Sequence, residues 1–175
     1  MSGTIRIIGL DPGLRHTGWG VVDVDGNRLR YVAHGRVSSD PTLSLAARLA
    51  ELFEGLNGII GRYRPDAAAV EETFVNKNPS STLKLGQARG AVLLAAATSG
   101  LAVAEYPPNL IKKSVVGSGH AQKQQVAMMV GTLLPGLGAV SEDESDALSV
   151  AICHAHLRQT QARLDAAIAA AEAGR

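Results

Sequence analysis

Acidic residues stand at three points of the sequence where a metal-dependent site could form. Asp11 follows an apolar run over residues 5–10, and Glu71 and Glu72 close a second run that begins at residue 67. Asp143 and Asp146 open the apolar stretch that ends at residue 157. Carboxylate oxygens suit Mg²⁺ or Mn²⁺, and two such ions about 4 Å apart can activate water for phosphodiester hydrolysis. The acids therefore predict a site for phosphate chemistry.

Asp11 also has a structural explanation, and Glu71 and Glu72 cannot both belong to the site. Asp11 begins Asp-Pro-Gly, a common turn, although it also follows a strand, where open α/β sheets place their ligands. Because side chains alternate across a strand, only one of Glu71 and Glu72 can face the site. The sequence pattern by itself leaves open which of the two it is.

The acids near residue 143 are explained only in part by helix capping. Ser141 and Glu144 fit a capping box, and acids in a first turn interact favourably with the helix dipole. Capping does not explain Asp146, which borders an apolar helical run where a lone carboxylate is costly to bury. Asp143 and Asp146 are three residues apart and share one helix face, so they are the better functional pair.

Charge is sorted along the chain although the total is nearly neutral. The formal net charge is +1, from 17 basic and 16 acidic residues among 175. The middle segment, residues 73–141, contains only one acidic residue, Glu105, among its basic residues. Residues 142–175, by contrast, carry more acidic than basic residues. A basic segment beside an acidic metal site is what a polyanionic substrate requires. The basic residues are Lys77, Lys84, Arg89, Lys112, Lys113 and Lys123.

Composition excludes several classes of protein. A chain of this length can bury a core as one domain without disulfides or a structural metal. The single Cys153 cannot form an internal disulfide, and it lacks the paired spacing of a zinc site. No apolar run is long enough to span a membrane, and the first residues lack the pattern of a signal peptide. We therefore expect a cytoplasmic protein without a membrane partner.

Hydrophobic periodicity predicts one α/β domain over residues 1–157. Apolar runs and turn signals predict strands, of which the first three form an antiparallel meander and the others a parallel half-sheet. The expected strands are 5–10, 19–24, 29–37, 67–72 and 101–106. The expected helices, which flank this mixed five-stranded sheet, are 43–60, 83–97, 109–116, 122–134 and 141–157. Residues 158–175 form an Ala-rich tail that we expect to be partly helical or disordered.

Five ordered motifs together resemble one known family. The motifs are Gly9-Leu10-Asp11-Pro12-Gly13 with Thr17-Gly18-Trp19-Gly20, Val70-Glu71-Glu72-Thr73-Phe74, Leu83-Lys84-Leu85-Gly86-Gln87-Ala88-Arg89-Gly90, Val115-Val116-Gly117-Ser118-Gly119 and Asp146-Ala147-Leu148. Over residues 5–157 the chain resembles the RuvC family of bacterial Holliday-junction resolvases, which are nucleases of the ribonuclease H-like fold. A single Gly-x-Asp-Pro-Gly motif is weak, whereas five motifs in order are specific.

The resemblance implies a metal site and a set of partners. It places four carboxylates on Asp11, Glu71, Asp143 and Asp146, with Glu71 chosen over Glu72, and implies Mg²⁺ or Mn²⁺, with two ions in each site. Some relatives have His where Asp143 stands. The family acts as a homodimer that cuts two opposed strands of a four-way DNA junction and leaves 5′-phosphate ends. It works with the RuvA and RuvB branch-migration proteins.

The resemblance also implies residues that contact DNA. Phe74 follows the expected strand, where an aromatic ring can stack on an unpaired base, although it can also pack on the next helix. The basic residues that match or adjoin family DNA contacts are Lys77, Lys84, Arg89, Lys112 and Lys123. Apolar residues on more than one side of helix 81–98 allow one side to pack on the sheet and another on a second copy.

Two other functions remain as alternatives. A noncatalytic junction-binding module would use the basic surface alone, but the four acids argue against it. An ATP-binding domain of the actin or sugar-kinase type has a related opening strand, but this chain is short for it and has no phosphate-binding loop of the P-loop type. His154 and His156 are better explained as core or surface residues than as metal ligands, because positions i and i+2 diverge on a helix.

Overall fold

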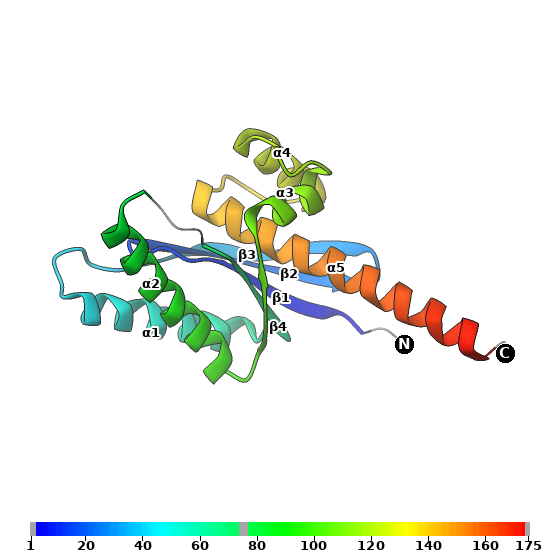
Figure 1. Ribbon diagram of the computed structural model, residues 1–175, viewed down its shortest axis with the longest axis horizontal. Helices are drawn as coiled ribbons and strands as arrows, with labels where there is room; N and C mark the ends of the chain where they lie inside the picture. Colours follow the sequence, from blue (N-terminus) through cyan, green and yellow to red (C-terminus); the bar gives the residue numbers. More distant parts are fainter. Residues whose placement is uncertain (1–2, 74–76, 174–175) are drawn as a thin grey trace.

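A mixed five-stranded sheet forms the centre of the computed structural model, which describes residues 3–73 and 77–173, with side chains up to residue 169 (Figure 1). The strands β1 (Ile5–Asp11), β2 (His16–Asp25) and β3 (Arg28–Ser38) form an antiparallel meander. β4 (Ala67–Glu71) pairs in parallel with β1, and β5 (Ala102–Tyr106) pairs in parallel with β4. The order β3-β2-β1-β4-β5 confirms the predicted combination of a meander and a parallel half-sheet.

Helices cover both faces of the sheet. One face carries α1 (Leu45–Tyr63) and α2 (Pro79–Thr98). The other carries α3 (Pro108–Val116), α4 (Lys123–Leu133) and α5 (Glu142–Ala173), with α5 lying along β1 and β2 (Figure 1). We refer to these as the α1/α2 face and the α5 face.

Alternation along the strands divides the core between the two faces. Ile7 and Val22 pack with α3, α4 and α5, whereas Ile8 and Val21 pack with α1 and α2. Because side chains alternate along a strand, residues an even number of positions from Ile7 also point to the α5 face. Asp11 at the end of β1 is one of them.

Two helices begin where a capping side chain is available. The side chain of Ser44 accepts a hydrogen bond from the backbone of Ala47, so α1 begins at residue 45, two residues later than predicted. Asn78 caps α2, and Pro79 fits the first helical position because it needs no backbone donor there. This cap and proline start α2 four residues before the predicted position.

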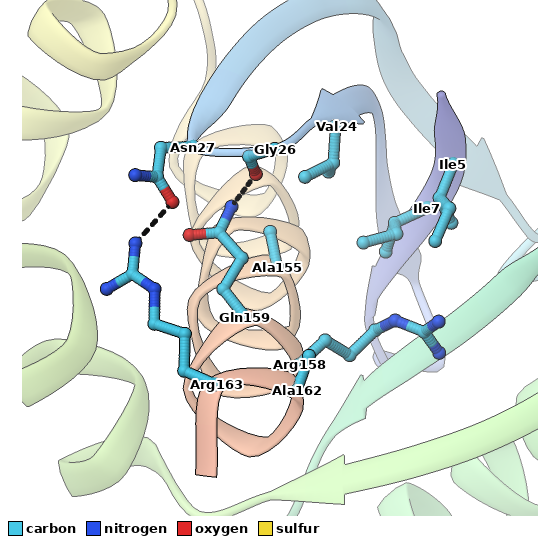
Figure 2. A pocket seen from close by; sticks show the side chains of 10 residues that line it. All are labelled: Ile5, Ile7, Val24, Gly26, Asn27, Ala155, Arg158, Gln159, Ala162 and Arg163. Carbon is cyan, nitrogen blue, oxygen red and sulfur yellow. Dashed lines mark hydrogen bonds between the residues drawn. The ribbon is translucent and has the colours of Figure 1, made fainter. Parts of the chain in front are cut away.

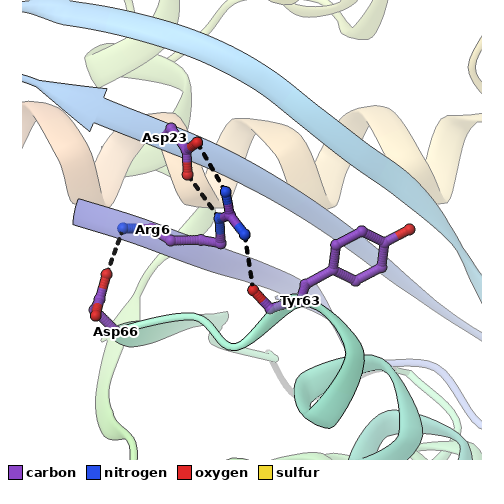
Figure 3. Close-up of polar contacts among 4 residues, drawn as sticks. All are labelled: Arg6, Asp23, Tyr63 and Asp66. Atoms are coloured by element: carbon purple, nitrogen blue, oxygen red, sulfur yellow. Dashed lines mark hydrogen bonds and ion pairs between the residues drawn. The ribbon is translucent and has the colours of Figure 1, made fainter. Parts of the chain in front are cut away.

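A polar cluster fixes the beginning of β1. The guanidinium of Arg6 donates two hydrogen bonds to the carboxylate of Asp23, at 2.7 and 3.0 Å, and one to the carbonyl of Tyr63 at 3.0 Å (Figure 3). The backbone N–H of Arg6 donates to Asp66 at 2.7 Å. Arg6 thus ties β1 to β2 and to the end of α1 through its side chain, and to the segment between α1 and β4 through its backbone.

The last helix is longer than predicted. α5 runs without interruption from Glu142 to Ala173, so the described part of the Ala-rich tail continues the helix that was predicted to end at residue 157. Its second half projects beyond the sheet (Figure 1). Among the described residues, no helix is long and apolar enough to cross a membrane.

Candidate active site

Strand geometry places two of the predicted carboxylates on the same face. Leu10 pairs with Val70 in the parallel β1–β4 ladder, so Asp11 and Glu71 follow at the carboxyl ends of neighbouring strands. Ala69 packs against Val150 of α5, and Glu71, two residues later, points to the same face. The sequence alone could not separate Glu71 from Glu72; the pleat of β4 puts Glu71 beside Asp11.

Glycines on the sheet allow α5 to bring the other two carboxylates close. A Cβ atom at Gly9 would lie 2.1 Å from the carbonyl oxygen of Ala147, and one at Gly18 would lie 2.1 Å from that of Asp143. Both distances are far below van der Waals contact, so no other residue fits without moving α5. Gly20, which pairs with Gly9 across the β1–β2 ladder, lies under Leu148. Gly9, Gly18 and Gly20 together form a strip, the glycine strip, on which the first turns of α5 rest.

The N-terminus of α5 is capped as predicted. The backbone of Ser141 donates a hydrogen bond to the side chain of Glu144 at 2.6 Å, and the backbone of Glu144 donates to the Ser141 hydroxyl at 3.5 Å. This capping box occupies Glu144. It leaves Asp143 and Asp146 free to face the carboxyl ends of β1 and β4.

One open cavity of about 370 Å³ contains all four predicted carboxylates. Its acidic lining consists of Asp11, Glu71, Glu72, Glu142, Asp143 and Asp146. A neighbouring cavity of about 230 Å³ adds Lys112, Lys123 and Ser149 around Glu71 and Asp146. The fold therefore gathers residues from β1, β4, α3, α4 and α5 at one end of the sheet.

Burial and mutual repulsion raise the pKa values of the central carboxyl groups. Burial raises the pKa of Asp11 well above its ordinary value, and the charges of Glu71, Asp146 and Asp143 raise it further. Burial and the charge of Asp146 also raise the pKa of Glu71, although a hydrogen bond between Asp11 and Glu71 opposes this rise. A site that disfavours negative charge in this way is stabilised by any cation that enters it.

Basic side chains already neutralise part of this charge. Lys123 forms an ion pair with Glu142 and lies 3.9 Å from the carboxylate of Asp146. Burial raises the pKa of Asp146, and the charges of Lys123 and Lys112 oppose the rise. Arg36 of β3 lies 3.8 Å from Asp143. No local sequence pattern marks Arg36, because only the pairing of β2 with β3 brings it near α5.

The donor set fits a hard divalent cation. The side chains are carboxylates, the ligands that Mg²⁺ and Mn²⁺ prefer, and burial together with mutual repulsion raises the pKa values of Asp11 and Glu71. Within residues 3–73 and 77–169, however, no three His, Cys, Asp or Glu side chains stand at metal-ligand spacing. The carboxylates share a cavity, but they must converge by side-chain rotation to share one ion.

The predicted DNA contacts fall into three groups. Lys112 and Lys123 border the carboxylates, whereas Lys77 and Lys84 are exposed just before and within the first turns of α2. Arg89 lies on the α1/α2 face, where it forms an ion pair with Glu105 and donates a hydrogen bond to the backbone carbonyl of Glu71 at 3.4 Å. Phe74 lies outside the described residues.

Comparison with known proteins agrees with this fold. The family model described as crossover junction endodeoxyribonuclease RuvC matches residues 7–154. Proteins of that name from Paramagnetospirillum magneticum and Rhodospirillum rubrum are each 60% identical, over 94% and 98% of this chain and 99% and 100% of theirs. The Thermus thermophilus RuvC structure in complex with Holliday junction substrate is 35% identical, with a TM-score of 0.84 over 90% of this chain and 96% of that chain.

These matches first define a class and then a family. The mixed sheet, the helices on its two faces and the acidic cavity at the carboxyl ends of β1 and β4 are those of a nuclease with the ribonuclease H-like fold. Within that class, the chain belongs to the crossover junction endodeoxyribonuclease RuvC family. The predicted fold and family are therefore confirmed.

Proposed function

We propose that the protein resolves Holliday junctions by metal-dependent hydrolysis of phosphodiesters in two opposed strands, during homologous recombination and DNA repair. Membership of the RuvC family supports the enzyme class, a crossover junction endodeoxyribonuclease. The observation that carries the chemistry is the acidic cavity in which β1, β4 and α5 place Asp11, Glu71, Asp143 and Asp146 together.

In this proposal the four carboxylates hold Mg²⁺ or Mn²⁺, with two ions in each site. Bound divalent ions supply an activated water and stabilise the leaving oxygen of an in-line displacement, which leaves 5′-phosphate ends. Asp11 and Glu71 are fixed by neighbouring strands, and α5 holds Asp146 over them. Cation binding also relieves the repulsion that raises the pKa values of these groups. Asp143 contributes from the first turn of α5, where Arg36 lies beside it.

Basic side chains around the cavity hold the DNA backbone. Lys112 and Lys123 line a cavity beside Glu71 and Asp146, where they can contact a phosphate next to a bound metal ion. Lys77 and Lys84 extend this basic surface along α2, and Phe74 stacks on a base near the cut. A phosphate contact by Arg89, whose side chain is 20% exposed, requires release of its guanidinium from Glu105.

The active form in this proposal is a homodimer. Ala88, Val92 and Ala95 of α2 pack on the sheet, whereas Leu83 and Leu94 stay 65% and 54% exposed. An exposed apolar face of this kind is suited to pair with its copy around a two-fold axis. Two sites related by that axis fit two opposed strands of a junction. RuvA and RuvB are the proposed partners, and the cytoplasm is the proposed location.

The decisive experiment compares Asp146→Asn with Asp165→Asn, which makes the same change on the exposed half of α5. We expect Asp146→Asn to lower cleavage of an immobile four-way junction in Mg²⁺ by at least about 100-fold, because it removes a carboxylate from the proposed metal site. Junction binding should stay intact or become tighter. Asp165→Asn should cut at the normal rate.

The same assay separates the alternative functions. Cleavage of the four-way junction but not of a linear duplex, in Mg²⁺ or Mn²⁺ and not with chelator, supports a metal-dependent resolvase. Equal cleavage of both substrates would indicate a general nuclease, and binding without cleavage a junction-binding module. Unchanged cleavage by Asp146→Asn would refute the proposed metal site.

A further inference from the structure

A further cavity lies at the end of β1 opposite to Asp11. Its volume is about 250 Å³, and it opens between α5 and the turn that joins β2 to β3 (Figure 2). It is lined by Ile5, Ile7, Val24, Gly26, Asn27, Ala155, Arg158, Gln159, Ala162 and Arg163. We refer to it as the turn cavity. None of its lining residues belongs to the acidic cavity.

Polar contacts fix the two walls of the turn cavity. The side-chain amide of Gln159 donates a hydrogen bond to the carbonyl of Gly26, and Arg163 donates one to the side-chain oxygen of Asn27 (Figure 2). The turn and the helix are therefore held together at one edge. Behind these contacts the space is wide because α5 presents Ala155 and Ala162, whose side chains are small.

The floor of the turn cavity is apolar and its rim is basic. Ile5, Ile7 and Val24 of the sheet form the floor, and the apolar floor continues into the core between the sheet and α5. Arg158 and Arg163 extend from α5 on either side of the opening (Figure 2). Neither guanidinium forms an ion pair with a carboxylate in the part of the chain that the structure describes. The rim can therefore bind anionic groups while the floor takes an apolar one.

Size and chemistry limit what can fill the turn cavity. Sites for drug-sized ligands measure about 300–1,000 Å³, so this cavity is smaller and suits a single large side chain. A DNA backbone has no apolar group to place on the isoleucine floor. Guanidinium groups bind carboxylates in paired hydrogen bonds, which favours an acidic polypeptide over a neutral one. The complementary ligand is a peptide with one apolar anchor between acids.

We propose that the turn cavity is a docking site for a partner protein that presents an acidic segment with one large apolar side chain. The apolar side chain enters between Ile5 and Ala162, and the flanking carboxylates pair with Arg158 and Arg163. Because the cavity lies at the other end of β1 from the carboxylates, the partner can stay bound while the acidic cavity holds DNA.

The test uses a fluorescent ten-residue peptide in which a single Phe is flanked on each side by two aspartates. Binding to the full-length protein is followed by fluorescence anisotropy, which does not depend on nuclease activity. We expect saturable binding that weakens at least 10-fold when the Phe is replaced by serine or the aspartates by lysines. NMR shift changes should be confined to the start of β1, the end of β2, the β2–β3 turn and residues 155–163.

Protein variants locate the binding site. Ala162→Trp fills the cavity and Arg163→Glu reverses charge at its rim, so each should weaken peptide binding at least 10-fold. The control Arg62→Glu makes the same charge reversal on α1, away from the cavity, and should bind the peptide normally. All three variants should cut a four-way junction at the normal rate.

Several results would overturn the proposal. They are absence of binding, equal binding of the serine or lysine peptide, normal binding by Ala162→Trp and Arg163→Glu, and shift changes centred on α2 or the acidic cavity. Displacement of the peptide by junction DNA would instead assign the surface to nucleic acid and would also overturn the proposal. None of these results depends on whether the protein cuts junctions.

Discussion

The two halves of α5 differ sharply although they form one helix. From residue 147 to 155 every side chain is buried, and Gly9 and Gly18 let the backbone of the helix rest directly on the sheet. From residue 161 to 169 every side chain is exposed, including Leu164 at 53% and Ile168 at 49%. The chain thus fixes the half that carries Asp146 and leaves the other half available to solvent or a partner.

The difference shows that the sheet, more than the helix, decides which part of α5 is rigid. Helix propensity does not explain the difference, since residues 158–173 hold seven alanines and residues 142–157 only three, although the first half is the buried one. Only the first half lies over strand residues without a Cβ atom. The following predictions test this comparison, beginning with the largest expected effect.

We expect Gly9→Ala to lower the free energy of unfolding by about 3 kcal/mol, since the new Cβ atom would overlap the backbone of α5. Cleavage should fall as well, because displacement of α5 moves Asp146 from Asp11. Gly61→Ala on exposed α1, where a Cβ atom meets nothing within 4 Å, should instead raise stability by about 0.5–1 kcal/mol. Urea denaturation measures both. Changes of the same sign would show that the glycine strip does not fix α5.

A second prediction concerns His154, which lies near the end of the buried half of α5. The phenol of Tyr106 lies 2.7 Å from Nδ1 of His154, and the Nε2 atom is buried with no hydrogen-bond partner in the described structure. Burial lowers the pKa of His154 from 6.5 to about 4. The unfolded state therefore binds more protons than the folded state between these pH values, and stability falls as the pH drops through this window.

After allowance for solvent screening, the loss at pH 4 should be about 1–2 kcal/mol relative to pH 7. His154→Gln removes the titrating group, so its unfolding free energy should depend less on pH over this range. Unfolding curves at pH 4 to 7 provide the measurement. An equally steep decline in the variant would assign the pH dependence to other groups.

The smallest effect is expected from the exposed half. Truncation after Arg163 removes side chains that contact little of the domain, so the free energy of unfolding should change by less than about 1 kcal/mol. Junction cleavage and the turn cavity should be retained. A large loss of stability would mean that the last turns of α5 are packed, for example against a second copy.

Much of the fold could be predicted from hydrophobic periodicity. The five strands, their mixed pairing and the positions of the helices follow from apolar runs and turn signals. The boundaries of α1 and α2 were less accurate because Ser44 and Asn78 act as caps, and several polar residues nearby could have done so. The continuation of α5 past residue 157 was not predicted, because the regular apolar pattern ends there, although no Gly or Pro interrupts residues 158–173.

The sequence predicted which residues form the candidate site, but it did not predict most of the contacts that position them. The four carboxylates were identified from their positions and from the family motifs, but the choice of Glu71 needed the motif or the pleat of β4. The glycine motifs were identified, whereas their role under α5 depends on contacts between distant segments. The ion pairs Arg89–Glu105 and Arg36–Asp143 likewise join residues that no local pattern connects.

Because α5 is one uninterrupted helix, it holds residues along its length at fixed distances from each other. A helix rises about 1.5 Å per residue, so the seventeen positions from Asp146 to Arg163 correspond to about 25 Å. That distance equals about seven base pairs of duplex at 3.4 Å per pair. A partner docked in the turn cavity would therefore be held about this far from the carboxylates of the acidic cavity.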